Sequence, residues 1–425
     1  MEVGKFNRHR WVFLLVCISS GLIFVWYSVR WAPRVTHGFA AYYTYARMLL
    51  DGEDLTQVYD YEEFNKRIHE YGMENVRDMP NNIPTNSVVM LPVAWMSPVA
   101  AKVSWTVISL IAFGASVALL FHLYGISLRE NLHLGILTLV FLWRPIYENV
   151  AFGQIYFVLL LLFSLAMYGL KRKNSFLSSA PMAAAVLFKG YGIVPLIWMT
   201  FRSYRKEVIF CLVFIILGGL LLLPRIGLVT WQKYYEAVIA SLGGLPMHGH
   251  TAFQTVNSFI THLFLFDAEW LPAPVLSLPA AVVRGLSYAA NIVLIILVVT
   301  RSNGNTAGTL LLSFSAVIAL GVVTAPLAEE YHYVLFLPLA IGLSAWTVKQ
   351  LLRTWKIGIL ELVILTAIII MALPLNYKFL NSAPQAFLLF AYPKLIAGIV
   401  LLFASGSVIR REESVPPNGN RERRA

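Results

Sequence analysis

Long apolar runs constrain this sequence more than any other feature. Soluble domains carry about 25% charged residues, whereas this 425-residue chain has 13% charged and 58% hydrophobic residues. Its mean hydropathy is +0.68. Runs near the roughly 20 residues that span a bilayer as a helix occur at about 11–31, 101–124, 132–149, 154–170, 207–224, 278–300, 307–326, 331–348, 357–374 and 388–409. The runs are continuous rather than alternating, which predicts an all-α polytopic membrane protein and excludes a β-barrel.

The charged residues predict how the spans are oriented. The net charge of +11 comes from basic residues at the ends of apolar runs, so it indicates membrane orientation rather than nucleic-acid binding. Basic clusters that mark the cytoplasmic side lie at residues 5–10, 171–173, 202–206, 349–356 and 410–424. Nine acidic residues crowd 51–78, which places the loop after the first span outside.

One segment does not fit a single crossing. Only 28 residues separate Lys173 from Arg202, and cytoplasmic-type charges flank both ends. Two short half-spans that meet at "FKGYGIVP" satisfy the charge rule, with Gly190, Gly192 and Pro195 as helix breakers. A plain single span with one misplaced charge cluster is the alternative. The hairpin gives roughly twelve crossings with both termini cytoplasmic.

This topology gives one membrane domain over residues 1–409 and a cytoplasmic polar tail over 410–425. The first span has no cleavage site after it and is expected to be retained. The first outer loop covers 32–100, with a surface helix near 55–71 and a second one within 84–98, neither crossing. A second outer region covers 225–277. Cys17 and Cys211 lie in apolar runs and imply no disulfide framework.

Ionisable residues at membrane depth are the first functional candidates, because they are costly to keep there. They fall into four groups: Arg144 with Glu148 and Gln154, then Lys189, then Arg225, and finally Glu329, Glu330 and His332 in "TAPLAEEYHYVLFLPL". All four groups are expected on the outer side. Lysine and arginine suit a phosphate, and a carboxylate or imidazole suits a proton acceptor.

Each group also has a structural explanation. Arg144 and Glu148 form an i, i+4 pair that suits a plain salt bridge. Lys189 and Arg225 can reach the interface as anchors, the two glutamates can be solvated turn residues, and His332 can bond a backbone carbonyl. His248, His250 and His262 share one outer region but lack regular metal-ligand spacing. No metal site and no cofactor are therefore expected.

Five segments, in order, resemble the polyprenol-phosphate-sugar-dependent glycosyltransferases of the GT-C superfamily, in particular family 87. They are "GFAAYYTYARMLLDGEDLTQVYD", "NNIPTNSVVMLPVAWMSP", "FGQIYFVLLLLFSL", "AAAVLFKGYGIVPLIWMTFRSYRK" and "TAPLAEEYHYVLFLPL". The resemblance implies a GT-C-type bundle that transfers a sugar from a polyprenyl phosphate to a lipid or glycan acceptor at the outer face, with inversion. It also implies that Lys189 contacts the donor phosphate.

The sequence departs from this family at one place that matters. Many GT-C enzymes carry an acidic base just after the first span, whereas "THGFAAYY" has His37 and Gly38 there. The base is then expected elsewhere, with Asp78, Glu148, Glu330, His332 and His37 as candidates. His332 and one of the two preceding glutamates are expected to line an outer cavity with Lys189 and residues 78–86.

The remaining expectations concern ligands and location. Arg144 and Arg225 are further candidates for the donor phosphate, and the candidate substrate contacts are Tyr42, Tyr43, Asn81, Asn82, Glu148, Gln154, His250 and Gln254. The expected location is a bacterial inner membrane. Two other classes remain open from the sequence: a lipid or sugar transporter, which would show an internal repeat, and a non-catalytic relative in envelope assembly.

Overall fold

The computed structural model describes residues 10–79, 81–240, 246–271, 274, 276–382 and 387–414. Apart from one bridge between Asp267 and Leu271, the regular elements in these ranges are helices. Six segments are long and apolar enough to cross a membrane: α2 (Arg10–Trp31), α6 (Pro98–Tyr124), α12 (Arg205–Ile226), α15 (Ala280–Arg301), Glu330–Thr354 and α20 (Pro393–Ser414). The prediction of an all-α polytopic membrane protein is therefore confirmed.

Shorter helices complete the bundle. Four of them are apolar: α9 (Tyr156–Lys171), α10 (Ser175–Lys189), α16 (Ala307–Val323) and α18 (Ile359–Ala372). The segment Glu330–Thr354 consists of the turn η5 (Glu330–Phe336) and α17 (Leu337–Thr354). The other bundle elements are α7 (Asn131–Leu142), α8 (Arg144–Phe152), α11 (Ile193–Phe201), α14 (Val256–Phe264), η4 (Pro246–Gly249) and α19 (Leu388–Ala391).

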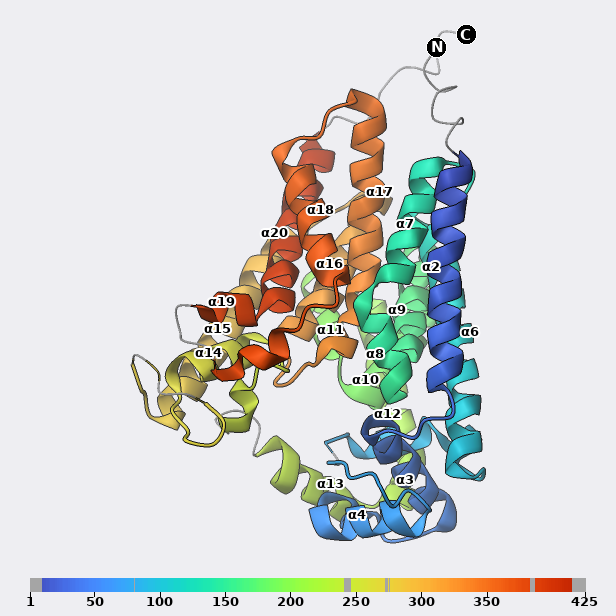
Figure 1. Cartoon of the computed structure of the whole chain (residues 1–425), viewed down its shortest axis with the longest axis vertical. Coiled ribbons are helices and arrows are strands. Elements are labelled where there is room, and N and C mark those ends of the chain that lie inside the picture. Colours follow the sequence, from blue (N-terminus) through green and yellow to red (C-terminus); the bar gives the residue numbers. More distant parts are fainter. Residues whose placement is uncertain are drawn as a thin grey trace.

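The turns with basic clusters gather at one end of the bundle, where α2 begins and α20 ends (Figure 1). Arg202 donates to the carbonyl of Gly304 at 2.8 Å, which joins two of these turns. Glu413 accepts from the backbone N–H of Asn305 at 2.8 Å and so joins a third. The expected polar tail from residue 410 therefore begins as helix, because Glu413 binds at the start of α16 and α20 continues to Ser414.

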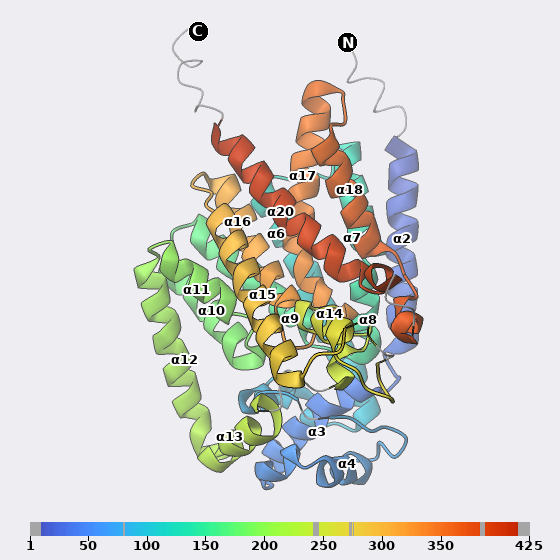
Figure 2. The same ribbon diagram turned by 90° about the vertical axis from the view of Figure 1, so that its left-hand side faces the viewer.

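The first loop forms a layer of short helices at the opposite end (Figures 1 and 2). The helix expected over 55–71 is divided at Asp60, whose carboxylate accepts from the backbone N–H groups of Glu62 and Glu63 and so starts a new helix. The elements of this layer are α3 (His37–Asp51), η1 (Leu55–Tyr59), α4 (Tyr61–Glu70), η2 (Pro84–Val88) and α5 (Leu91–Ala94), with α13 (Leu228–Tyr234) and the turn η3 (Tyr235–Ile239) beside them. None of them is long enough to cross a bilayer.

The predicted hairpin between two basic turns is present. α10 ends at Lys189, and α11 begins at Ile193. Gly190 has φ +74°, a left-handed conformation that favours glycine and ends α10. The chain therefore reverses directly after Lys189, and the lysine lies at the hairpin tip.

A second break places another part of the site. The span expected over 132–149 is divided at Trp143, and Pro145 lies in the first turn of α8. The indole N–H of Trp143 donates to the carbonyl of Tyr333 at 3.1 Å. This bond fixes α8 against η5, so that two polar segments far apart in the sequence lie side by side.

Candidate active site

Lys189 lies at the centre of a group of polar side chains that we call the hairpin-tip cluster: Lys189, Tyr42, Asn82, Gln154 and Asp78. The ammonium donates to the hydroxyl of Tyr42 at 2.8 Å and to the side-chain oxygen of Asn82. The Tyr42 hydroxyl donates in turn to Oε1 of Gln154 at 3.0 Å. Among the described residues, no carboxylate forms an ion pair with Lys189. Its direct hydrogen bonds are therefore to neutral oxygens, while the carboxylates of Asp78 and Glu329 act on its charge from a longer distance.

The first loop is bonded to the hairpin tip through the backbone. Thr85 donates to the carbonyl of Leu187, and the side-chain amide of Asn86 donates to the carbonyl of Phe188. Both carbonyls lie in the last turn of α10, where helix carbonyls lack partners within the helix. These bonds explain why η2 and the segment before it lie against Lys189.

Asp78 is the carboxylate of this cluster. Its Oδ1 accepts from the backbone N–H of Met79 at 2.7 Å, and its backbone N–H donates to Asn65 at 2.9 Å. Its Oδ2 is buried without a hydrogen-bond partner among the described residues. Burial raises the pKa of Asp78 to about 8, and the negative charge of Glu329 adds to this increase, while Lys189 opposes it.

The packing around Gly38 explains why no carboxylate stands after the first span. A Cβ atom at Gly38 would lie 2.2 Å from Nε2 of Gln154 and 2.9 Å from the carbonyl of Phe152. The space that a side chain would need here is filled by the amide that binds Tyr42. His37, the other candidate at this place, packs against Phe152 in a tilted arrangement, with 4.6 Å between ring centroids. Burial lowers its pKa, with a further contribution from the charge of Lys378.

The segment before α17 brings an imidazole and a carboxylate to the same region. The His332 ring contacts those of Tyr156 and Tyr331, with 4.5 Å between centroids in each pair. The charge of Lys189 acts on this imidazole. Glu329 accepts from the Tyr331 hydroxyl at 2.9 Å. Burial raises the pKa of Glu329.

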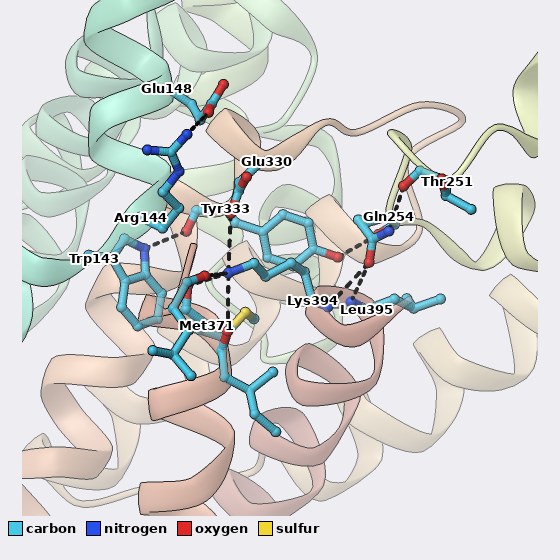
Figure 3. A network of polar contacts seen from close by, with 12 residues as sticks. Trp143, Arg144, Glu148, Thr251, Gln254, Glu330, Tyr333, Met371, Lys394 and Leu395 are labelled. Carbon is cyan, nitrogen blue, oxygen red and sulfur yellow. Dashed lines mark hydrogen bonds and ion pairs between the residues drawn. The ribbon is translucent and has the colours of Figure 1, made fainter. Parts of the chain in front are cut away.

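Glu330 points elsewhere, into a group that we call the junction cluster: Glu330, Lys394 and the carbonyls of Ile370, Met371 and Leu373. Lys394 is fully buried, lies 3.1 Å from Oε1 of Glu330, and donates to the three carbonyls at 2.7–3.0 Å (Figure 3). Glu330 is therefore engaged by Lys394. Of the two glutamates expected beside His332, Glu329 is the one whose charge acts on Lys189.

Arg144 and Glu148 form the expected pair on α8, near Glu330 (Figure 3). Glu148 is 8% exposed, and its charge acts on Glu329, Glu330 and His37. The pair therefore lies between the two clusters. Its guanidinium already neutralises the carboxylate of Glu148.

Other predicted residues lie outside the hairpin-tip cluster. The hydroxyl of Tyr43 donates to the carbonyl of Met96, and Asn81 is exposed. Gln254 is buried, and its amide is used by backbone groups of Thr251, Ala391 and Lys394 (Figure 3), which gives it a structural role.

Two more predicted residues also lie apart. His250 accepts from the backbone N–H of Ala252. Arg225 is exposed at the end of α12, and no described residue pairs with it.

Sequence reasoning missed four residues near these clusters: Lys394, Lys378, Tyr156 and Tyr331. Lys394 had a usable signal, because it is a lysine inside the apolar run 388–409. Lys378 lies in η6 (Tyr377–Ser382), and its charge acts on Glu329, His37 and His250. The two tyrosines had no signal, because buried tyrosines are common in any core.

The fold and the cluster together define a multi-pass membrane protein with a buried, charged site at the end of the bundle opposite its basic turns. Among the residues that the structure describes, no group of histidine, cysteine or acidic side chains could hold a metal ion. The sequence model of glycosyltransferase family 87 matches residues 83–326, more than half of the chain. The chain belongs to this family and is a membrane glycosyltransferase. No curated protein matches it.

Proposed function

We propose that this enzyme transfers a sugar from a polyprenyl phosphate to a hydroxyl group of a lipid or glycan acceptor. One observation carries the proposal: the half-buried Lys189 donates to neutral oxygens of Tyr42 and Asn82 and has no ion-pair partner among the described residues. A buried cation without a counter-ion is costly unless a ligand supplies the negative charge. A lipid phosphate supplies it.

The membrane placement supports this donor class. With the basic turns in the cytoplasm, the hairpin tip and the first-loop helices lie on the extracytoplasmic side. The six long helices, the four shorter apolar ones, α7 with α8, and α11 together suit roughly twelve crossings in a GT-C-type bundle. We place the enzyme in a bacterial inner membrane. A lipid-linked sugar donor is at hand on the outer side of such a membrane.

Asp78 is the proposed general base. Glu330 is paired with Lys394, and Glu148 with Arg144, so neither carboxylate is free to accept a proton. Glu329 already accepts from Tyr331. Asp78 forms no salt bridge among the described residues, and a pKa near 8 suits proton transfer close to neutral pH.

Asp78 and Lys189 account for the proton and the leaving group of the transfer reaction. The acceptor hydroxyl oxygen forms a bond to the anomeric carbon, and its proton passes to Asp78. The bond from the anomeric carbon to the phosphate oxygen breaks, and the electron pair leaves with the polyprenyl phosphate. Lys189 stabilises the charge of the departing phosphate. Attack from the face opposite the phosphate inverts the anomeric carbon.

Purified protein in lipid nanodiscs tests this function. Radiolabelled polyprenyl-phosphate sugars and nucleotide sugars are offered in parallel with acceptor lipids extracted from bacterial membranes. We expect label transfer from a polyprenyl-phosphate sugar and its loss in Asp78→Asn. Transfer from a nucleotide sugar alone, or full transfer by Asp78→Asn, would contradict the proposal.

A further inference from the structure

The imidazole of His332 is held by the backbone of Glu329, three residues earlier. The backbone N–H of Glu329 lies 3.0 Å from Nδ1 of His332, and the carbonyl of Glu329 lies 3.2 Å from the same nitrogen. Only one of these contacts is a hydrogen bond at a given time. If Nδ1 carries a proton, it donates to the carbonyl; if it does not, it accepts from the N–H.

The backbone bonds decide between the two states. The carbonyl of Glu329 already accepts from the backbone N–H of His332 at 3.0 Å. The backbone N–H of Glu329 has no acceptor other than Nδ1 among the described residues. A backbone donor left without a partner costs free energy, whereas a carbonyl with one bond is satisfied. Nδ1 is therefore the acceptor, and the proton of the neutral ring is on Nε2.

The other edge of the ring faces the site. Nε2 has no hydrogen-bond partner among the described residues, and it is not one of the atoms closed off from solvent. His332 is 8% exposed, so the accessible part of the residue includes this edge. Tyr156 and Tyr331 contact the ring, and Lys189 is near enough for its charge to act on it. Nε2 is therefore the ring nitrogen that remains available to a ligand in the region where the charge of Lys189 acts.

We propose that His332 uses its Nε2–H to donate a hydrogen bond to a phosphate oxygen of the donor lipid, beside Lys189. This rests on the function proposed above and reverses the role expected from the sequence, in which the imidazole was a candidate proton acceptor. A ring protonated on Nε2 and bonded through Nδ1 has no free lone pair with which to accept a proton. It supplies a neutral donor where the phosphate charge grows as the sugar leaves.

Two amide variants test the roles of the two ring nitrogens of His332 separately. In His332→Asn, the side-chain oxygen can take the place of Nδ1 and accept from Glu329, but no donor reaches the position of Nε2. In His332→Gln, the longer side chain can place an amide N–H near the position of Nε2. The probe is undecaprenyl phosphate, with undecaprenol as the uncharged control, and binding is measured by native mass spectrometry in nanodiscs.

We expect His332→Asn to keep the melting temperature of the wild type and to bind undecaprenyl phosphate roughly 10- to 100-fold more weakly, the range for one hydrogen bond to a charged group. His332→Gln is expected to retain most of the affinity. Undecaprenol binding is expected to be the same in all three proteins. Wild-type affinity in His332→Asn, or equal losses in both variants, would overturn the proposal.

The result also separates this inference from the proposed function. If the wild type prefers undecaprenyl phosphate no more than undecaprenol, the proposed function fails. If it does prefer the phosphate and His332→Asn binds as well as wild type, only the role of His332 fails.

A measurement on the unaltered protein covers the case in which a variant does not fold. His332 follows Tyr331, and this is the only Tyr-His step in the sequence. Tyrosine labelled with ¹³C at the carbonyl and histidine labelled with ¹⁵N therefore single out His332 by solid-state NMR. We expect the proton on Nε2. A proton on Nδ1, or on both nitrogens, would contradict the proposal.

Discussion

Two lysines in this enzyme, the fully buried Lys394 and the half-buried Lys189, are bonded in opposite ways. Lys394 in the junction cluster has three carbonyls and the carboxylate of Glu330 around its ammonium. Lys189 in the hairpin-tip cluster has two neutral oxygens and no ion-pair partner among the described residues. The first lysine is satisfied by the protein itself. The second has no anion in direct contact among the described residues, and Asp78 and Glu329 act on it only from a longer distance.

The difference between the two lysines distinguishes charged side chains with a structural role from those that bind a ligand. A satisfied buried charge joins elements: Lys394 links the end of α18 to the start of α20 and to η5. An incompletely satisfied charge that lies among other polar side chains, as Lys189 does, is a candidate for binding a ligand, because the ligand can supply the missing counter-charge. Removing Lys189 is therefore expected to affect activity, and removing Lys394 to affect stability.

The largest effect is expected for Lys189→Met. We expect turnover to fall roughly 100- to 1,000-fold, the loss typical of one group that stabilises charge in a transition state. The melting temperature is expected to stay the same or to rise, since a half-buried cation is removed. Transfer assays and thermal unfolding of the same preparation check both values. A Lys189→Met protein that is less stable, but whose folded fraction has normal turnover, would mean that Lys189 has the same structural role as Lys394.

Lys394→Met is expected to act on stability. Removing one partner of a buried ion pair typically costs about 3–5 kcal/mol, because the other charge is left uncompensated. Denaturation in detergent measures the loss. Adding Glu330→Gln in the same chain is expected to restore part of it, since the unpaired carboxylate is then gone. No recovery in the double variant would mean that the three carbonyls matter more than the ion pair.

The pH dependence of turnover tests the carboxylate of the hairpin-tip cluster. A general base acts when it has lost its proton, so kcat/KM is expected to rise with pH and to level off above about 8, the pKa of Asp78. The charge of Glu329 contributes to that pKa. Glu329→Gln is therefore expected to move the midpoint to lower pH. An unchanged midpoint would mean that the charge of Glu329 does not act on Asp78.

The smallest effect is expected for Arg225→Met. Arg225 is exposed at the end of α12 and has no partner among the described residues, so its charge is screened by solvent. We expect donor KM and turnover to change by less than about twofold, as for an isolated surface charge. A tenfold increase in donor KM would show that the donor phosphate passes Arg225 and would extend the site beyond the hairpin tip.

The fold was largely predictable because its signals are local. Apolar length and the placement of basic residues predicted the main helices, and Gly190 with its neighbours predicted the hairpin break. The division of the span at Trp143 was missed although Pro145 is a local signal for it, and the bond from Trp143 to Tyr333, which joins residues 190 positions apart, has no such signal.

The site was predictable only in part. Lys189, Tyr42, Asn82, Gln154 and Asp78 were named from the sequence, and the structure brings them together. Their roles depend on which groups are already paired. The sequence does not show that Lys394 engages Glu330, nor that backbone groups use the amide of Gln254. Those pairings remove candidates and leave Asp78.

The central claim is that Lys189 holds the donor phosphate, and a structure with the ligand bound tests it most directly. Cryo-electron microscopy of the enzyme in nanodiscs with undecaprenyl phosphate is expected to show a phosphate oxygen within about 3 Å of the Lys189 ammonium, the distance of a charge-assisted hydrogen bond. The Nε2 atom of His332 is expected on the same phosphate. Phosphate density beside Arg225, with the contacts of Lys189 to Tyr42 and Asn82 unchanged, would contradict the claim.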